Sequence, residues 1–168
     1  AQARQRIEQQ RARQASAAQK DLTAALVAQI SQLEKAAAEN AELAEGMDAV
    51  RAAQRRQLQA ELELAQARGD TAQAIQLTAA LVAQEIQDLQ ALAAAKQAEA
   101  ANLREQIARR EALRVAQGDN NTEAEKELAL LRQKLLIADA EAGDATANGQ
   151  ALAAKKTATD QSKDSTDG

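Results

Sequence analysis

The sequence predicts an all-α protein built from long, thin helices that join along narrow apolar seams. Ala, Gln, Leu, Glu, Arg and Lys make up 124 of the 168 residues, a composition typical of long helices and coiled coils. Pro is absent, so Gly is the only strong helix breaker. Apart from 46 Ala, only 30 residues are Leu, Ile, Val or Met, which is too few to fill a globular core for this length.

The residue types that are missing exclude several kinds of site. Without Cys and His there is no disulfide, no thiolate or imidazole metal ligand, and no Cys or Ser–His nucleophile. Without aromatic residues there is no stacking platform for single-stranded nucleic acid. No window approaches the ~18 apolar residues of a membrane-spanning helix. We therefore expect no catalytic, cofactor or metal site, no specific nucleic-acid partner and no membrane contact in this segment.

Glycine–aspartate pairs divide the chain into helices, because Gly suits the left-handed position after a helix and Asp suits the N-cap of the next. The pairs are Gly69-Asp70, Gly118-Asp119 and Gly143-Asp144. In the second case Thr122, with Glu125 three residues later, is the better N-cap. The breaks predict a long helix within 1–67, a second over 71–116 and a third over 122–142.

The two ends of the chain carry further expectations. Residues 144–168 contain one large apolar residue, Leu152, and end in a polar run, so we expect a frayed, flexible tail there. Met47 is the only methionine. We therefore expect the chain to be a segment of a longer protein or a processed product.

Apolar residues at heptad spacing predict the surface along which the helices associate. The second helix keeps an unbroken heptad register, a strong signal for association. The expected self-association seam comprises Leu26, Ile30, Leu33, Met47, Ile75, Val82, Ile86, Leu89, Leu103, Ile107, Leu128, Leu131 and Leu135. Lys96 and Asn40 interrupt it, and each either fixes the register of the partner helices or reaches water from a loose seam. For Lys96 we favour the second interpretation.

Two layouts fit these helices. If the first break is a tight reversal, the first two helices pair antiparallel, and partners such as Leu58 and Leu81 have numbers that sum to 139. The third helix folds back in the same way if Leu103 and Leu135, which sum to 238, are partners. If the breaks are kinks, the chain runs on as one rod of about 210 Å that associates with copies of itself as an extended coiled coil. We favour the extended layout, because the hairpin alone would lack apolar mass.

Charged clusters are interpreted as solvated helix faces. The first twenty residues carry a local charge of +4 that six Gln dilute. A second basic cluster, Arg104, Arg109, Arg110 and Arg114, is offset by Glu105 and Glu111. The densest carboxylates, within 61–63 and 123–127, lie on faces without a pocket that could shift a pKa, so we expect no paired-acid catalysis. The adhesion-like tripeptide at 68–70 is interpreted as a helix stop and start.

An internal near-repeat adds a family resemblance. The eight residues Leu22–Gln29, LTAALVAQ, recur as Leu77–Gln84 at an offset of 55, which indicates growth by duplication. Together with Ala/Gln/Leu-rich helices broken by ARGDTAQA over 67–74, and with the missing Cys, His, Pro and aromatic residues, this pattern resembles the helical part of a bacteriophage tail tape measure protein.

The resemblance implies a structural role. A tape measure protein is an extended ruler in the lumen of the phage tail tube that sets tail length and leaves before the DNA. It implies assembly in the bacterial cytoplasm, copies of the chain as partners, with a trimer favoured, and contacts with tail tube and tail tip proteins. A second function class stays open: a bacterial helical-hairpin adaptor or stalk that docks other proteins. A ruler is an elongated oligomer, whereas an adaptor hairpin is a shorter monomer.

Overall fold

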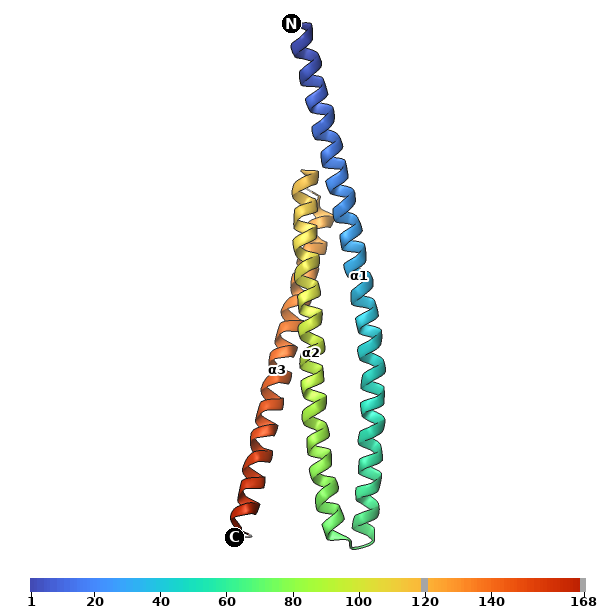
Figure 1. Ribbon diagram of the computed structural model, residues 1–168, viewed down its shortest axis with the longest axis vertical. Coiled ribbons are helices and arrows are strands. Elements are labelled where there is room, and N and C mark those ends of the chain that lie inside the picture. Colours follow the sequence, from blue (N-terminus) through green and yellow to red (C-terminus); the bar gives the residue numbers. More distant parts are fainter. Residues whose placement is uncertain (119–120, 167–168) are drawn as a thin grey trace. The chain divides into compact units, whose positions relative to one another are not determined.

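The computed structural model describes residues 1–118 and 121–166, with side chains up to residue 162. These residues form the long helices α1 (Gln2–Ala67), α2 (Thr71–Gln117) and α3 (Thr122–Thr166), shown in Figure 1. No strand occurs in the described part of the chain. The protein is therefore all-α, as the sequence predicts. The helices are long because strong helix formers dominate and no Pro interrupts them.

The chain divides into two compact units, and every helix contributes a segment to each. Unit 1 comprises residues 1–39 and 100–136, and unit 2 comprises residues 40–99 and 137–168. In unit 1 the first 22 residues of the chain are all exposed, and Gln19 among them donates to the Ala116 carbonyl of α2.

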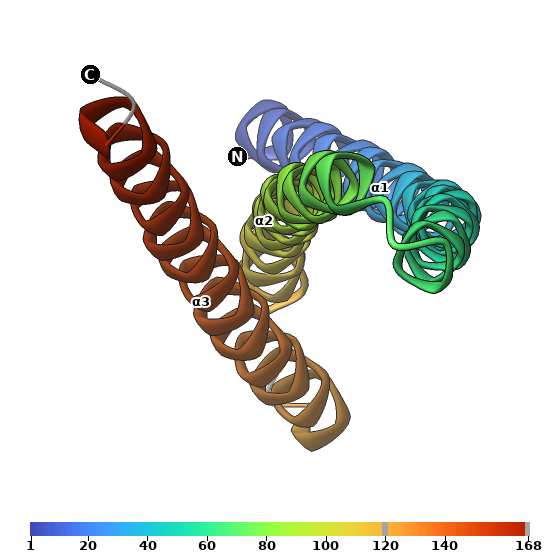
Figure 2. The ribbon, with the colours of Figure 1, turned by 90° about the horizontal axis from the view of Figure 1, so that it is seen from below.

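The turn between α1 and α2, in unit 2, reverses the chain within three residues (Figure 2). Gly69 has a φ of 73°, in the left-handed region that Gly adopts without strain. The amide of Gly69 donates to the Gln66 carbonyl at 3.1 Å, and the amide of Asp70 donates to the Ala65 carbonyl at 3.0 Å. This pair of bonds is a Schellman motif. Asp70 then caps α2, because its Oδ1 accepts from the Gln73 amide at 3.1 Å.

The turn between α2 and α3, in unit 1, uses a different cap from the one predicted. Gly118 again has a positive φ, 61°. The cap of α3 is Asn121, whose Oδ1 accepts from the Glu123 amide at 3.0 Å, while Thr122 is the first helical residue. Thr122 as N-cap was therefore wrong, since an Asn immediately before it offers a better-placed acceptor. Asp119 lies outside the described residues.

The helices lie antiparallel in both units, so the favoured extended rod was wrong and the hairpin alternative holds. In unit 2, Arg51 of α1 lies 3.9 Å from Asp88 of α2, and their numbers sum to 139, as a reversal at 69–70 requires. In unit 1, Asn102 of α2 donates to the Leu33 carbonyl of α1 at 3.0 Å. The physical reason is the positive φ at each turn glycine, because a left-handed residue ends a helix and reverses the chain instead of bending it.

The apolar mass that seemed insufficient for a hairpin is supplemented by alanine. In unit 1 the buried apolar residues are Leu26, Ile30, Ala100, Leu103, Leu128 and Leu131. In the described part of unit 2 they are alanines, and larger residues such as Leu58, Leu81 and Leu89 are half-buried. These alanines are Ala65, Ala93, Ala138, Ala142 and Ala145. Small side chains let helices approach closely, as at Gly149 of α3, where a Cβ would stand 3.5 Å from the Leu89 Cβ of α2. Close contact thus adds to the packing of the half-buried large side chains in unit 2.

The third predicted break does not exist. In unit 2, α3 continues through Gly143 and Asp144 to Thr166, so the predicted helix end at residue 142 and the flexible tail over 144–168 were both wrong for the described residues. Gly143 keeps a helical backbone, and an interior Gly costs only about 1 kcal/mol relative to Ala. Burial of Ala142 and Ala145 on either side of it offsets that cost, because both alanines belong to the core of unit 2.

Candidate interaction surfaces

The residues of the predicted seam fall into three groups by solvent exposure. Leu26, Ile30, Leu103, Leu128 and Leu131 are buried, all in unit 1. Leu33, Val82, Ile86, Leu89, Ile107 and Leu135 are half-buried. Met47 and Ile75, both in unit 2, remain 46% and 57% exposed. The seam therefore closes within the chain in unit 1 and stays partly open in unit 2.

The two polar interruptions of the seam differ from each other. Asn40 is exposed. Lys96 is half-buried, and its Nζ lies 2.8 Å from Glu141 of α3 and 3.2 Å from Glu99 in unit 2. The hydrogen bond to Glu141 raises the pKa of Lys96 above its ordinary 10.5, with Glu99 adding to the rise and partial burial opposing it. Lys96 thus joins α2 to α3 and does not simply extend into water.

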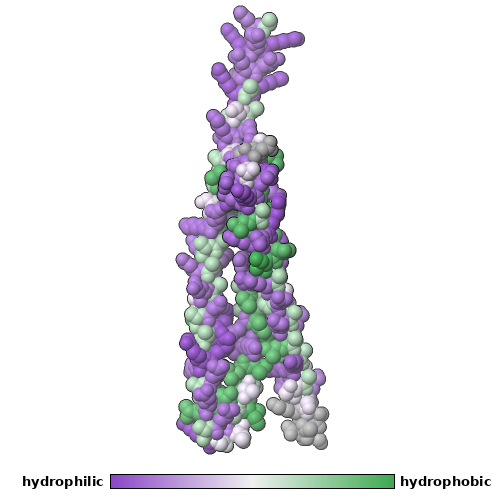
Figure 3. All heavy atoms as spheres, turned by 180° about the vertical axis from the view of Figure 1, so that it is seen from behind, coloured by the Kyte–Doolittle hydropathy of each residue, from purple (hydrophilic) through white to green (hydrophobic). Residues whose placement is uncertain are grey.

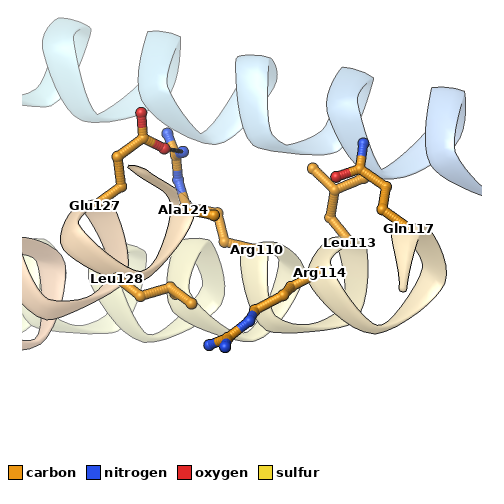
Figure 4. A pocket seen from close by; sticks show the side chains of 7 residues that line it. All are labelled: Arg110, Leu113, Arg114, Gln117, Ala124, Glu127 and Leu128. Carbon is orange, nitrogen blue, oxygen red and sulfur yellow. Dashed lines mark hydrogen bonds and ion pairs between the residues drawn. The ribbon is translucent and has the colours of Figure 1, made fainter. Parts of the chain in front are cut away.

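Arg110 ties all three helix segments of unit 1 together. Its Nη1 lies 2.8 Å from Glu127 of α3, and its Nη2 pairs with Glu34 of α1. Figure 4 shows Arg110 and Glu127 pointing toward one another, with Arg114 on the other side. The Arg110 side chain is 23% exposed, so this pairing is screened less than a surface ion pair. A neighbouring cavity of about 50 Å³ has room for water molecules but for no larger ligand.

A polar relay runs beside Arg110 in the same unit. Gln106, only 5% exposed, donates through Nε2 to the Asn102 Oδ1 at 2.6 Å. Asn102 in turn donates to the Leu33 carbonyl at 3.0 Å. A buried polar group must be hydrogen-bonded to be tolerated, so this relay fixes one register between α1 and α2.

Asp88 plays the corresponding part between α1 and α2 in unit 2. Its side chain is 16% exposed, and its Oδ1 accepts from Gln84 Nε2 at 3.1 Å. Arg55 Nε lies 3.1 Å from Oδ2 as an ion pair that lacks hydrogen-bond geometry. Gln84 also donates to Gln54 of α1 at 3.3 Å. The contacts place one carboxylate between two guanidinium groups, since Arg51 lies 3.9 Å away.

Sequence reasoning missed the arginines as contacts between helices. Arg110 and Arg114 were interpreted as part of a solvated face, yet they pair with Glu127 and Glu125 of α3. A signal was present, because the numbers in these pairs sum to 237 and 239, close to the 238 of the predicted fold-back register. Reading opposite charges in that register, as well as leucines, would have found both pairs.

Unit 2 presents a groove between α2 and α3 with a volume of about 590 Å³. Its α2 wall is mostly apolar and includes Ile75, Ala79 and Val82. Its α3 wall carries Leu152 and a polar rim of Lys155, Lys156, Thr159 and Asp160. Figure 3 shows hydrophobic side chains gathered beside the hollow next to the lower part of α3. The groove is large enough for side chains of another helix.

A second apolar surface of unit 2 lies on α1. Leu43, Met47 and Val50 are 63%, 46% and 58% exposed. Their spacing of four and three residues places them on one face of the helix, and we call them the α1 stripe. Exposed apolar residues that form a contiguous patch mark interaction sites, whereas single ones do not.

No group of three or more carboxylates is arranged to hold a metal ion in the part of the chain that the structure describes. Among the described helices, none combines the length and hydrophobicity that crossing a membrane requires. No family model matches the chain, and comparisons with curated proteins and with solved structures find no match either.

Proposed function

We propose that this chain is a helical-hairpin adaptor or stalk that acts by protein–protein association through its helix faces and carries out no catalysis. One observation carries the proposal. In the described part of unit 2 the buried residues are alanines and Gly149, while Leu43, Val50 and Ile75 stay more than half exposed. Large apolar residues that stay exposed in this way offer area for contacts with other proteins, copies of itself included.

Substitution of the exposed apolar residues tests this proposal. The variant Leu43→Ser/Val50→Ser/Ile75→Ser should keep its helical content, because all three side chains are exposed, and should lose concentration-dependent association. The matched control changes three exposed alanines, Ala53→Ser, Ala72→Ser and Ala94→Ser. Light scattering with small-angle X-ray scattering measures mass and dimensions. Association of the apolar variant at the wild-type level would overturn the proposal.

A second candidate function is the length-setting role that the resemblance to tape measure proteins implies. The 55-residue near-repeat favours it, as does α1, whose 66 residues span about 100 Å at 1.5 Å per residue. As a ruler, the chain would lie in the lumen of a phage tail tube with its hairpins opened, as a trimer in contact with tube and tip proteins. The helical rise would then convert residue number into tail length.

Deletion of residues 22–76 tests the ruler. It removes one 55-residue period and joins two equivalent positions, so the tail should shorten by about 80 Å. The control replaces the same residues with an unrelated Ala/Gln-rich helix of equal length, which should leave the tail unchanged. Electron micrographs give the tail length. Tails of wild-type length in the deletion variant would refute the role of this segment as a ruler.

A further inference from the structure

The two seam residues that stay exposed lie on two separate surfaces of unit 2. Met47 is at the centre of the α1 stripe, and Ile75 lines the groove between α2 and α3. Each surface therefore offers apolar area that the heptad pattern assigns to a helix–helix contact. The question is whether the two surfaces fit each other.

The stripe is short enough to fit the groove. The α1 stripe covers residues 43–50, about 10 Å along the helix. The α2 wall of the groove covers residues 71–82, about 17 Å. The stripe, two helical turns long, can therefore lie within a wall of about three turns.

The two surfaces also differ in charge. Residues 39–50 contain Glu39, Glu42, Glu45 and Asp48 and no Lys or Arg. Asp48 is paired with Arg51 of its own helix at 3.4 Å, and the three glutamates are exposed. The rim of the groove carries Lys155 and Lys156 beside a single carboxylate, Asp160. Complementary charge of this kind orients the encounter and selects the partner.

A single copy cannot fill its own groove with its own stripe. Partners on α1 and α2 sum to about 139, as Arg51 and Asp88 do, so Met47 lies level with residue 92 of α2. The α2 wall of the groove is centred between residues 76 and 77, about 23 Å further along the helix. We propose that the α1 stripe of one copy docks into the α2–α3 groove of a second copy. The inference rests on the proposed association function and names its partner.

This contact joins two different surfaces of the copies. Two copies that dock reciprocally, each stripe in the groove of the other, close as a pair. Where one contact forms alone, a free stripe and a free groove remain, so further copies add until the assembly closes into a ring or continues as a filament. A dimer in which stripe meets stripe would also stop at two copies. Stripe-in-groove and stripe-on-stripe contacts differ in how blocked variants complement each other.

A pair of blocked variants provides the test. Met47→Glu places a carboxylate in the stripe and leaves the groove intact, whereas Ala79→Arg fills the groove and leaves the stripe intact. Each variant alone should keep the mass of one chain at concentrations where the wild type assembles. An equimolar mixture should form a two-chain complex and nothing larger, because only one pairing of intact surfaces remains. Both positions are exposed, and far-UV circular dichroism verifies that helicity is kept.

Controls place the same new side chains at other exposed alanines, with Ala53→Glu on α1 and Ala94→Arg on α2, and these should assemble like the wild type. Assembly of either blocked variant at the wild-type level overturns the docking, as does a mixture that stays at one-chain mass. Either result, with the triple serine variant still defective, leaves the adaptor function standing. A wild type that keeps one-chain mass at every concentration overturns the docking between copies and leaves the adaptor with partners other than itself.

Discussion

The same substitution, Gly to Ala, should have opposite effects at two glycines of this chain. Gly69 ends α1 with a φ of 73°, whereas Gly143 lies inside α3 with a helical backbone. A Cβ added at either position meets no atom within 4 Å. Sterics against neighbouring residues therefore do not decide the outcome, and the backbone conformation does.

The magnitudes follow from the two conformations. At Gly69, Ala would carry its Cβ in the left-handed region, at a cost of about 1–2 kcal/mol. At Gly143, Ala would lower the conformational entropy of the unfolded chain and favour helix, a gain of about 0.5–1 kcal/mol. The free energies of unfolding of the two variants should therefore differ by roughly 1.5–3 kcal/mol.

Urea unfolding followed by far-UV circular dichroism, at one fixed protein concentration, measures the difference. Gly46→Ala is the matched control, since Gly46 also lies inside a helix with nothing within 4 Å, and it should stabilise like Gly143→Ala. A loss of stability in Gly143→Ala would refute the reasoning. It would mean that residue 143 has a positive φ and that α3 ends there, as the sequence alone predicted.

Three further predictions concern the helix contacts. Spin labels at Gln54→Cys and Glu85→Cys should lie within about 20 Å of each other, because antiparallel α1 and α2 pack at about 8–10 Å between axes. A label distance of about 46 Å, the rise of a straight helix between the two positions, would instead support the extended rod. The difference in free energy of unfolding between wild type and Lys96→Met should be constant up to about pH 10 and fall above pH 10.5. Glu141 raises the pKa of Lys96 in the folded state, so the contribution of the lysine is lost as the pH rises through this raised pKa. A difference that stays unchanged at higher pH would contradict this prediction. Arg110→Ala should lower the free energy of unfolding by about 1–2 kcal/mol, a value between those of surface and buried ion pairs. Arg109→Ala should lower it by about 0.3–0.5 kcal/mol, because the partner of Arg109 lies one turn away in the same helix. Equal losses in the two variants would argue against the three-helix contact.

The local signals of this sequence were reliable where one residue type decides the conformation. Both turn glycines were predicted, because few residue types other than Gly adopt a positive φ in front of a cap residue. The third Gly-Asp pair misled for the same reason. Gly143 has the residues of a break, but burial of Ala142 and Ala145 stabilises the helix across it. Packing against another helix cannot be read from the residues around a glycine.

The layout was harder to predict, because two arrangements used the same apolar residues. Sums of 139 and 238 were visible in the sequence, but the count of large apolar residues favoured association between copies. That count treated alanine as neutral. In the described part of unit 2 the buried apolar residues are alanines, and charged residues such as Arg51 and Asp88 fix the register between helices. Which residue of one helix contacts which residue of another depends on distances that are defined only in the folded chain.

The alanine core of unit 2 has a thermodynamic consequence. The heat capacity increment of unfolding grows with the apolar area that becomes hydrated, and an alanine exposes little of it. The increment per residue should therefore fall below the usual value of about 12–15 cal/mol/K. A small increment gives a flat stability curve, so the free energy of unfolding changes slowly with temperature. The same small area gives a shallow dependence on urea, and such a chain melts over a wide interval while cold denaturation recedes to low temperature.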